Sequence, residues 1–421
     1  MAQPDRDLLL DRAAEGPRPP TNDFPDLEHV QQRLAAFERL YNEIAEQFNL
    51  SDKDRNGTVN VGTRKVNAFE RRVRWTRQTA VLRGLISKDE PSVWRLTETA
   101  NATLGNIVRG SILTFAISEN GAFLWANAED AVGMIEKGSV QCICSSPPYP
   151  LLHPKAYGNV APALYVDWLT RLFEKWLPLL TTDGSFLVNI GHVFKEAVAA
   201  QQLHVERLLI KLEDSLGIHL LQHLYWHSPT KMPPLQWVGI KRLRVTPSVE
   251  PLLWLSPNPN AYGNNRNVLR EYTPGGLRSI AKPRLKAHPS GFSFGAGSFV
   301  DKGGSIPPSL IVATPCGAEE VRYRKAVRAA GLEPHPAILP AAVARFGIQL
   351  ATDPGDVVYD PMCGSGTVAV EAMKLGRKAI ASDRSYAYLE SAMLRCQAEQ
   401  IAMTRVGVEP GCSVGSLQLT A

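Results

Sequence analysis

A strand, a glycine-rich turn, a helix and a second strand follow one another near the carboxyl end of the chain. The first apolar run ends in the acid Asp360 and the second ends in Asp383, with a helical pattern from Val368 to Leu375 between them. The turn after the first strand consists of Pro361, Met362, Cys363, Gly364, Ser365, Gly366 and Thr367. The glycines of such a β-α-β unit let a ligand approach the backbone closely. The sequence therefore predicts an α/β fold with parallel strands and a ligand site at this turn.

The acids on either side of the turn help to identify its ligand. Asp383 stands at the tip of the second strand, where an acid can accept hydrogen bonds from ribose hydroxyls. A dinucleotide has such a ribose, but Asp360 would repel its pyrophosphate. Ala369 also stands where dinucleotide sites usually have a third glycine, although some of them tolerate this change. S-adenosylmethionine combines a ribose with a sulfonium and an ammonium group, so we predict that this methyl donor is the ligand.

A second motif, Ser146-Pro147-Pro148-Tyr149, directly follows a strand pattern from Val140 to Cys144. Two consecutive prolines cannot continue a strand, and neither has an N–H group, so the chain leaves the sheet as a stiff, extended turn. The carbonyl groups of this turn lack local partners, and the tyrosine ring beside them is held in place. The turn is suited to binding a planar group that carries an amine, although a proline-rich loop without function would have the same sequence.

Helical and strand patterns alternate from Gly121 onward, which predicts a parallel sheet covered by helices. The expected strands lie at residues 122–126, 140–144, 185–190 and 220–226, and the expected helices at 131–136, 165–180 and 205–216.

Basic residues are concentrated between Lys231 and Arg328. This segment has 15 Lys and Arg against 5 Asp and Glu, whereas the net charge of the whole chain is only +5. The segment is also rich in Pro, Gly and Asn, which predicts a loop-dominated module that binds a polyanion. A solvated basic face would have the same composition. The residues that we expect to contact the polyanion are Arg242, Arg244, Arg278, Lys282, Arg284 and Lys286.

The N-terminal part of the chain shows a different pattern. A helical pattern at 26–49 is followed by a polar loop at 52–62, a basic amphipathic helix at 66–82 and one arm of a hairpin at 91–97. This is the element order of a winged helix, and residues 69–97 resemble the N-terminal module of the Mrr family of restriction proteins. Four arginines of this part are candidates for phosphate contacts, unless the module serves packing or dimerisation: Arg71, Arg72, Arg74 and Arg77.

The cysteines and the apolar runs indicate the setting of the protein. None of the six cysteines forms a C-x-x-C pair and no histidines lie near them at zinc-ligand spacing, so no metal site is predicted. The sequence has no apolar run of membrane-spanning length and no signal-peptide pattern. We therefore expect a soluble protein in a reducing, intracellular setting.

The two motifs together resemble those of the DNA amino-methyltransferases, which methylate cytosine N4 or adenine N6. Ser146 to Tyr149 match the catalytic motif of that family, and Asp360 to Thr367 match its donor-binding motif. The catalytic motif comes first and the basic segment lies between the two, which is the order of the beta subclass. The resemblance covers residues 120–400.

The resemblance implies further site residues. His335 and Pro336 would enclose the methionine part of S-adenosylmethionine, and Asn127 would contact its adenosine. Three positions depart from the family pattern: Met362 replaces a Phe, Asp383 replaces the commoner Glu, and Asn127 replaces an Asp.

The fold implied is a Rossmann-like S-adenosylmethionine-dependent methyltransferase fold with an inserted target-recognition region and an N-terminal winged-helix domain. The expected division is a tail at 1–25, a winged-helix-like domain at 26–118, a catalytic half at 119–227, the target-recognition region at 228–330, a donor-binding half at 331–405 and a tail at 406–421.

Ser146 points to cytosine N4, because cytosine-N4 enzymes of this family usually have Ser at that position and adenine enzymes have Asp or Asn. The expected activity is site-specific methylation of a flipped cytosine in a restriction-modification system. Double-stranded DNA is then the substrate, and a cognate restriction endonuclease and a second copy of the chain are candidate partners. The resemblance also implies a cytoplasmic protein of a prokaryote, associated with the nucleoid through DNA. The alternatives are an adenine-N6 enzyme, a methyltransferase for RNA or protein glutamine, and a DNA-binding regulator without turnover. The order of the motifs disfavours the second alternative, and their intactness disfavours the third.

Overall fold

The computed structural model describes residues 109–151, 159–282 and 300–406, together with shorter pieces between residues 41 and 107 and two short strands at 286–287 and 293–294. The chain divides into two compact units, Met1–Ala100 and Asn101–Ala421.

The elements of the first unit whose bounds the structure describes are a short helix and two antiparallel hairpins. The elements are α3 (Asp52–Asn56), β1 (Thr58–Val61) paired with β2 (Arg64–Asn67), and β3 (Ile86–Glu90) paired with β4 (Val93–Leu96). The prediction of a polar loop at 52–62 is wrong, because α3 and β1 occupy that stretch. Ser51 caps α3 by accepting a hydrogen bond from the Asp54 N–H at 3.2 Å.

Strand β4 confirms the hairpin arm expected at 91–97. The basic helix expected from Val66 begins later, because Val66 belongs to β2, and helical residues are described at 68–71 and 73–74. Arg74 forms an ion pair with Glu70 at 2.9 Å, whereas Arg72 and Arg77 lie outside the described residues.

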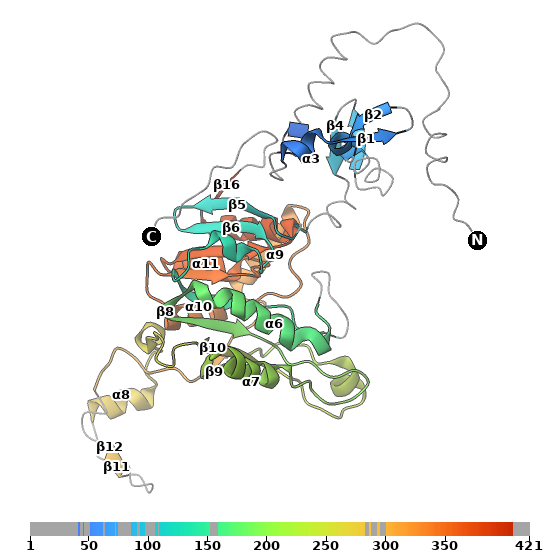
Figure 1. Cartoon of the computed structure of the whole chain (residues 1–421). Coiled ribbons are helices and arrows are strands. Elements are labelled where there is room, and N and C mark those ends of the chain that lie inside the picture. The colour runs from blue at the N-terminus through green and yellow to red at the C-terminus, as the bar shows by residue number, and fades with distance from the viewer. Residues whose placement is uncertain are drawn as a thin grey trace. The chain divides into compact units, whose positions relative to one another are not determined.

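A mixed sheet forms the centre of the second unit, and its described strands run in the order β13-β9-β10-β8-β7-β14-β15-β6-β5-β16 (Figure 1). Five adjacent strands, from β8 to β6, are parallel to one another, which confirms the predicted parallel sheet for its middle. Strands β10, β5 and β16 each pair antiparallel. The bounds are β5 (Ile112–Ser118), β6 (Gly121–Ala126), β7 (Val140–Ser145), β8 (Leu180–Asn189), β9 (His219–His227), β10 (Val249–Ser256), β13 (Leu310–Val312), β14 (Val357–Asp360), β15 (Lys378–Asp383) and β16 (Thr404–Arg405).

Helices cover both faces of this sheet (Figure 1). They are α6 (Pro162–Trp176), α7 (His204–Leu216), α9 (Ala318–Ala329), α10 (Ala341–Ala351), α11 (Thr367–Lys374) and α12 (Tyr386–Ala398). The helix expected at 131–136 is a single 3-10 turn, η1 (Ala131–Met134), and the predicted helix at 165–180 ends in another, η2 (Leu177–Leu179).

The segment 228–330 is less loop-dominated than predicted. Strand β10 lies inside the central sheet between β9 and β8, and α9 packs against α12. The strand escapes a pattern search because it is buried on both faces, so polar residues do not alternate, and because Pro251 normally argues against a central strand. Loops with short elements occupy most of the rest: η3 (Leu235–Ile240), η4 (Asn265–Val268), α8 (Pro274–Ala281), β11 (Lys286–Ala287) and β12 (Ser293–Phe294).

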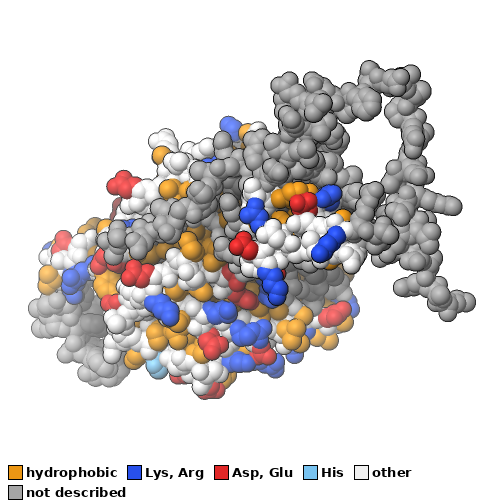
Figure 2. All heavy atoms as spheres, turned by 45° about the horizontal axis from the view of Figure 1, so that its top comes forward, with side chains coloured by type: hydrophobic (Ala, Val, Ile, Leu, Met, Phe, Trp, Pro, Cys, Tyr) orange, Lys and Arg blue, Asp and Glu red, His pale blue; other side chains and the backbone are white. Residues whose placement is uncertain are grey.

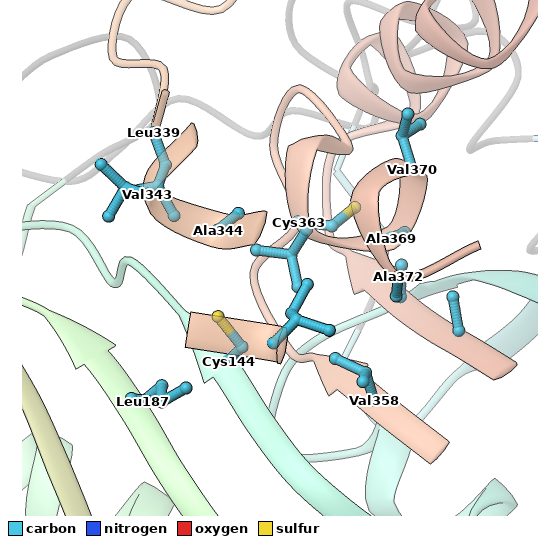
Figure 3. Packing of buried hydrophobic residues seen from close by; sticks show 14 of the residues in the cluster. Cys144, Leu187, Leu339, Val343, Ala344, Val358, Cys363, Ala369, Val370 and Ala372 are labelled. Atoms are coloured by element: carbon cyan, nitrogen blue, oxygen red, sulfur yellow. The ribbon is translucent and has the colours of Figure 1, made fainter. Parts of the chain in front are cut away.

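The core on one face packs α10 and α11 against the parallel strands (Figure 3). Val343 and Ala344 of α10 and Ala369 of α11 lie over strand residues of this core. Cys144 and Cys363 are part of it, and burial raises the pKa of both thiols well above their usual value. Neither cysteine is therefore a ready thiolate nucleophile, and both pack in the core.

The surface carries both signs of charge. On the face shown in Figure 2, Lys and Arg side chains lie among Asp and Glu side chains. In the part of the chain that the structure describes, no helix combines the length and the apolar character needed to cross a bilayer.

Candidate active site

The two sequence motifs meet at the carboxyl ends of neighbouring parallel strands. Strand β7 ends at Ser145, directly before the Pro-Pro turn, and β14 ends at Asp360, directly before the glycine-rich turn. The Ser145 hydroxyl donates a hydrogen bond to Asp360 Oδ1 at 2.8 Å. One pocket lies between the two turns, and its lining residues are Ser146, His335, Ala337, Leu339, Asp360, Met362, Cys363, Gly364, Ser365, Thr367 and Val368.

The glycine-rich turn has the backbone shape that only glycine adopts easily. Gly364 and Gly366 have φ angles of 47° and 73°, in the left-handed region. A Cβ on Gly364 would lie 3.0 Å from His335 Nε2, so the glycine also makes room for this imidazole at the pocket. The ring of His335 is held by the Ala337 carbonyl, 2.6 Å from Nδ1, and by an edge contact with Tyr388.

Two buried carboxyl groups flank the turn. Burial raises the pKa of Asp360 to about 7, with a further contribution from the nearby charge of Asp383. Burial likewise raises the pKa of Asp383 to about 6. Asp383 accepts hydrogen bonds from the N–H groups of Gly364 at 2.9 Å and Ser385 at 2.8 Å, which fix its carboxylate beside the turn.

These features fit the predicted methyl donor. Burial destabilises the ionised form of a carboxyl group and so raises its pKa, and a cation placed beside the group stabilises that ionised form. S-adenosylmethionine carries positive charge for Asp360 and ribose hydroxyls for Asp383. The left-handed glycines allow the backbone of the turn to approach such a ligand without a Cβ in the way.

The Pro-Pro turn is held by contacts from distant strands. The Tyr149 hydroxyl lies 2.8 Å from both Asn189 Oδ1 and Glu250 Oε2, and its single proton serves one of them at a time. Asn189 Nδ2 donates to the Pro251 carbonyl at 3.1 Å, which turns Oδ1 toward Tyr149. Ser146 Oγ lies 3.5 Å from the Tyr149 hydroxyl. Burial raises the pKa of Tyr149 well above its usual value, and Glu250 adds to this, so the phenol stays protonated.

Three of these side chains are not found by the sequence motifs: Asn189, Glu250 and Lys231. Asn189 ends β8, and Glu250 lies in β10 with an ion pair to Lys231. One signal was available for Glu250, because it is an acid directly after the acid-free basic stretch 228–249. No local signal links it to Tyr149, 101 residues earlier.

Gly191 makes room for this arrangement, and Gly191→Ala is expected to lower turnover about tenfold or more. A Cβ there would lie 2.5 Å from Tyr149 Cε2 and 3.2 Å from Glu250 Cδ, so the ring must move. Methyl transfer to DNA and donor binding by calorimetry would be measured together, and the donor affinity should not change. Gly133→Ala is the matched control, because its nearest neighbour would be at 3.6 Å. Unchanged turnover in Gly191→Ala would contradict the role given to the Tyr149 position.

The predicted donor-site residues divide into two groups. Those that line the pocket are His335, Asp360, Met362, Cys363, Gly364, Ser365 and Thr367. Pro336, Pro361, Gly366, Asp383 and Asn127 are not among its lining residues. Of these, Asp383 binds the Gly364 N–H and Gly366 caps α11, whereas Asn127 lies after β6 with its Nδ2 3.4 Å from Asp130 Oδ2.

The basic residues predicted to contact DNA lie on several short elements. Arg242 and Arg244 follow η3, Arg278 lies on α8 and Lys282 follows that helix, and all four are exposed. Lys286 belongs to β11, and Arg284 lies outside the described residues.

Comparisons with known proteins agree with the fold and the motifs. A DNA methylase family model matches residues 140–394, and the model of the Mrr N-terminal domain matches residues 25–106. Type II methyltransferase M.PvuII of Proteus hauseri is 30% identical over 283 residues, covering 66% of this chain and 84% of the relative. Type II methyltransferase M.Cfr9I of Citrobacter freundii is 24% identical over 325 residues, covering 68% and 91%. A solved PvuII DNA methyltransferase (cytosine-N4-specific) superimposes with a TM-score of 0.55 at 25% identity, covering 68% of this chain and 90% of that structure.

These matches confirm the predicted family resemblance, the methyltransferase fold and the Mrr-like N-terminal module, while the winged-helix arrangement of that module stays a prediction. They also confirm S-adenosylmethionine as the methyl donor and double-stranded DNA as the substrate. Because the family model spans more than half of the chain, the protein belongs to the DNA methylases and transfers methyl groups from S-adenosylmethionine to DNA.

Proposed function

We propose that the protein methylates the exocyclic N4 of cytosine at a specific sequence of double-stranded DNA. The observation that carries this proposal is Ser146, which stands at the first position of the catalytic motif and lines the pocket of the donor turn. The 30% identical relative M.PvuII supports it, because its solved counterpart is named as cytosine-N4-specific.

The catalytic turn has to activate a weak nucleophile. The lone pair of an exocyclic amine is delocalised into the base, so the nitrogen reacts poorly until hydrogen-bond acceptors draw on its two hydrogens. We assign this work to the Ser146 hydroxyl and the Pro147 carbonyl, while Tyr149 stacks on the base. S-adenosylmethionine, when bound, supplies an electrophilic methyl group. Most of the rate then comes from positioning.

The nitrogen gains a methyl group and must lose one hydrogen as a proton. Ser146 Oγ lies 3.5 Å from the Tyr149 hydroxyl, which lies 2.8 Å from Glu250 Oε2. We assign to these groups a path that carries the proton away from the amine and delivers it to Glu250. Before the proton arrives, Lys231 offsets the negative charge of the Glu250 carboxylate, with which it forms an ion pair.

The donor side of the pocket is assigned by charge. Asp360 faces the cationic part of S-adenosylmethionine and Asp383 its ribose, while His335 and Pro336 enclose the methionine part and Asn127 contacts the adenosine. Residues 228–330 contain the target-recognition region, with Arg242, Arg244, Arg278, Lys282, Arg284 and Lys286 as phosphate or base contacts.

Donor binding is expected to strengthen as the pH rises from about 5.5 to about 7.5. The pKa values of Asp360, about 7, and of Asp383, about 6, lie above the usual range, so both groups are mostly protonated at the acidic end of this interval and mostly ionised at the other. An ionised carboxylate attracts the donor's positive charge, and the dissociation constant should fall about tenfold or more over this interval. Calorimetric titration checks this. Asp360→Asn should flatten most of the dependence, and an equally steep profile in that variant would refute the assignment.

The activity is tested by transferring labelled methyl groups to native DNA and analysing the nucleosides. We expect N4-methylcytosine, and recovery of N6-methyladenine alone would overturn the proposed base. Sequencing of methylated bases in a host that carries the gene would give the recognition sequence.

We also propose that the enzyme protects DNA from a restriction endonuclease of the same specificity and that it forms a homodimer. The first follows from its relatedness to type II methyltransferases. Resistance of the modified host DNA to candidate endonucleases tests the first, and light scattering of the full chain tests the second.

A further inference from the structure

The segment between β9 and β10, residues 228–248, projects from the edge of the sheet that carries the catalytic turn. Strand β9 pairs with β10 so that His227 faces Val249, and β10 pairs with β8 so that Leu252 faces Asn189. The end of β9, the start of β10 and the end of β8 therefore lie at one edge. Figure 1 shows the segment as the yellow-green loop beyond α7, on the side toward which β8 points.

This segment exposes apolar side chains between basic ones. Met232 is 84% exposed, Leu235 72% and Val245 86%, and Ile240 and Leu243 are exposed as well. Single exposed apolar residues are ordinary, but five within 14 positions mark a contact surface. The same stretch has four basic residues and, from 228 to 249, no acid. The basic residues are Lys231, Lys241, Arg242 and Arg244.

The outward apolar side chains do not reflect a lack of structure. Trp237 is buried in the middle of the segment, and its carbonyl accepts hydrogen bonds from the N–H groups of Leu243 at 2.9 Å and Arg244 at 3.2 Å. The Lys241 ammonium lies 5.6 Å from the centre of the Trp237 ring. Two prolines, Pro233 and Pro234, stiffen the approach to Leu235. The segment is thus a folded loop with an anchored centre and an apolar outer surface.

The base of the segment is tied to the catalytic turn. Lys231 forms an ion pair with Glu250, and Glu250 lies 2.8 Å from the Tyr149 hydroxyl. Met232 directly follows Lys231 and Leu235 lies three residues further on, so both exposed side chains are close in the chain to a residue tied to the catalytic turn.

We propose that Met232 and Leu235 enter the DNA duplex and fill the gap that the flipped cytosine leaves in the base stack. This inference rests on the proposed function and assigns a further part of the same site. Charge complementarity identifies the partner, because the flanking Lys and Arg residues meet phosphates while the apolar side chains meet stacked bases. Filling the gap offsets the cost of unstacking and unpairing the target.

The test uses full-length protein and two duplexes that contain the mapped recognition sequence. One duplex is intact, and in the other the base opposite the target cytosine has been removed, which lowers the cost of flipping. The double variant Met232→Ser with Leu235→Ser should methylate the intact duplex about tenfold or more slowly than the wild type. On the duplex without the opposing base its rate should return to within about threefold of the wild type.

Two further variants isolate the role of the apolar side chains. Ile210→Ser on α7, 61% exposed, is the matched control and should behave as the wild type on both duplexes. Arg242→Ala with Arg244→Ala should weaken binding to both duplexes and lower its salt dependence, without rescue by the missing base.

The proposal is overturned if the Met232 and Leu235 double variant matches the wild type on the intact duplex, or if it is equally slow on both duplexes while it melts and binds the donor as the wild type does. Failure of the proposed function would look different, because the wild type itself would then leave no N4-methylcytosine in either duplex.

Discussion

Ser146→Ala is expected to lower the rate of methyl transfer by about 100-fold or more while the affinity for S-adenosylmethionine changes little. The hydroxyl is one of the two acceptors that we assign to the target amine. Its other contacts are weak, at 3.4 Å to Asn189 Oδ1 and 3.5 Å to the Tyr149 hydroxyl, so its removal should leave the turn in place. Single-turnover transfer to DNA and calorimetric titration of the donor measure the two effects separately.

Ser139→Ala provides the control, because this serine is only partly buried, lies outside the pocket and bonds only to the nearby Glu136 carbonyl among the contacts described. Full activity of Ser146→Ala would remove the catalytic assignment. A combined loss of activity and donor binding would instead indicate that Ser146 supports the donor pocket.

Asp360→Ala is expected to weaken donor binding about 30-fold or more, because a buried charged partner of the ligand is lost. The same change removes the acceptor of two hydrogen bonds, from Ser145 Oγ at 2.8 Å and from the Met362 N–H at 3.1 Å. Asp360→Asn keeps an acceptor for both while it removes the charge. Calorimetry on the two variants therefore separates the effect of the charge from the effect of the two lost hydrogen bonds. If Asp360→Asn bound the donor as tightly as the wild type does, an electrostatic role of Asp360 would be contradicted.

Thermal melting of the two variants shows whether either substitution also destabilises the fold. Asp356 directly precedes β14, at the end opposite Asp360, so Asp356→Asn is the matched control that removes a carboxylate charge outside the pocket. It should bind the donor as the wild type does.

The sequence was sufficient to predict the site wherever the residues of a motif are contiguous in the chain. The residues from Asp360 to Thr367 form one turn, and so do those from Ser146 to Tyr149, so each motif could be recognised without knowledge of the fold. Placing the two turns together needed only the rule that parallel strands have their carboxyl ends at one edge of a sheet. The structure has them on the adjacent strands β7 and β14.

The support of the catalytic turn could not be predicted in this way. Asn189 reaches Tyr149 because β8 pairs in parallel with β7, and Glu250 reaches it because β10 pairs antiparallel with β8. The pairing of β10 with β8 joins residues about sixty positions apart, and Pro251 makes β10 hard to recognise in the sequence. Such pairings leave no periodic pattern that links either residue to Tyr149, so both were missed.

The short helix α3 was missed for a different reason. None of its residues is buried, so it has no apolar periodicity by which a helix is usually recognised. Its capping residue Ser51 and the acids Asp52 and Asp54 in its first turn were the available signal.

The hydrogen bond from Ser145 to Asp360 connects the donor site with the start of the catalytic turn, so the binding of the two substrates should be coupled. A cation that binds beside Asp360 changes the electrostatic surroundings of this carboxylate. Ser145, which donates a hydrogen bond to it, directly precedes the first residue of the catalytic turn. Each ligand should therefore alter the affinity for the other, and linkage requires the factor to be the same in both directions. The affinity of the protein for its DNA target is then expected to differ with and without bound donor. Measuring both affinities of each ligand, alone and in the presence of the other, would give this cooperativity.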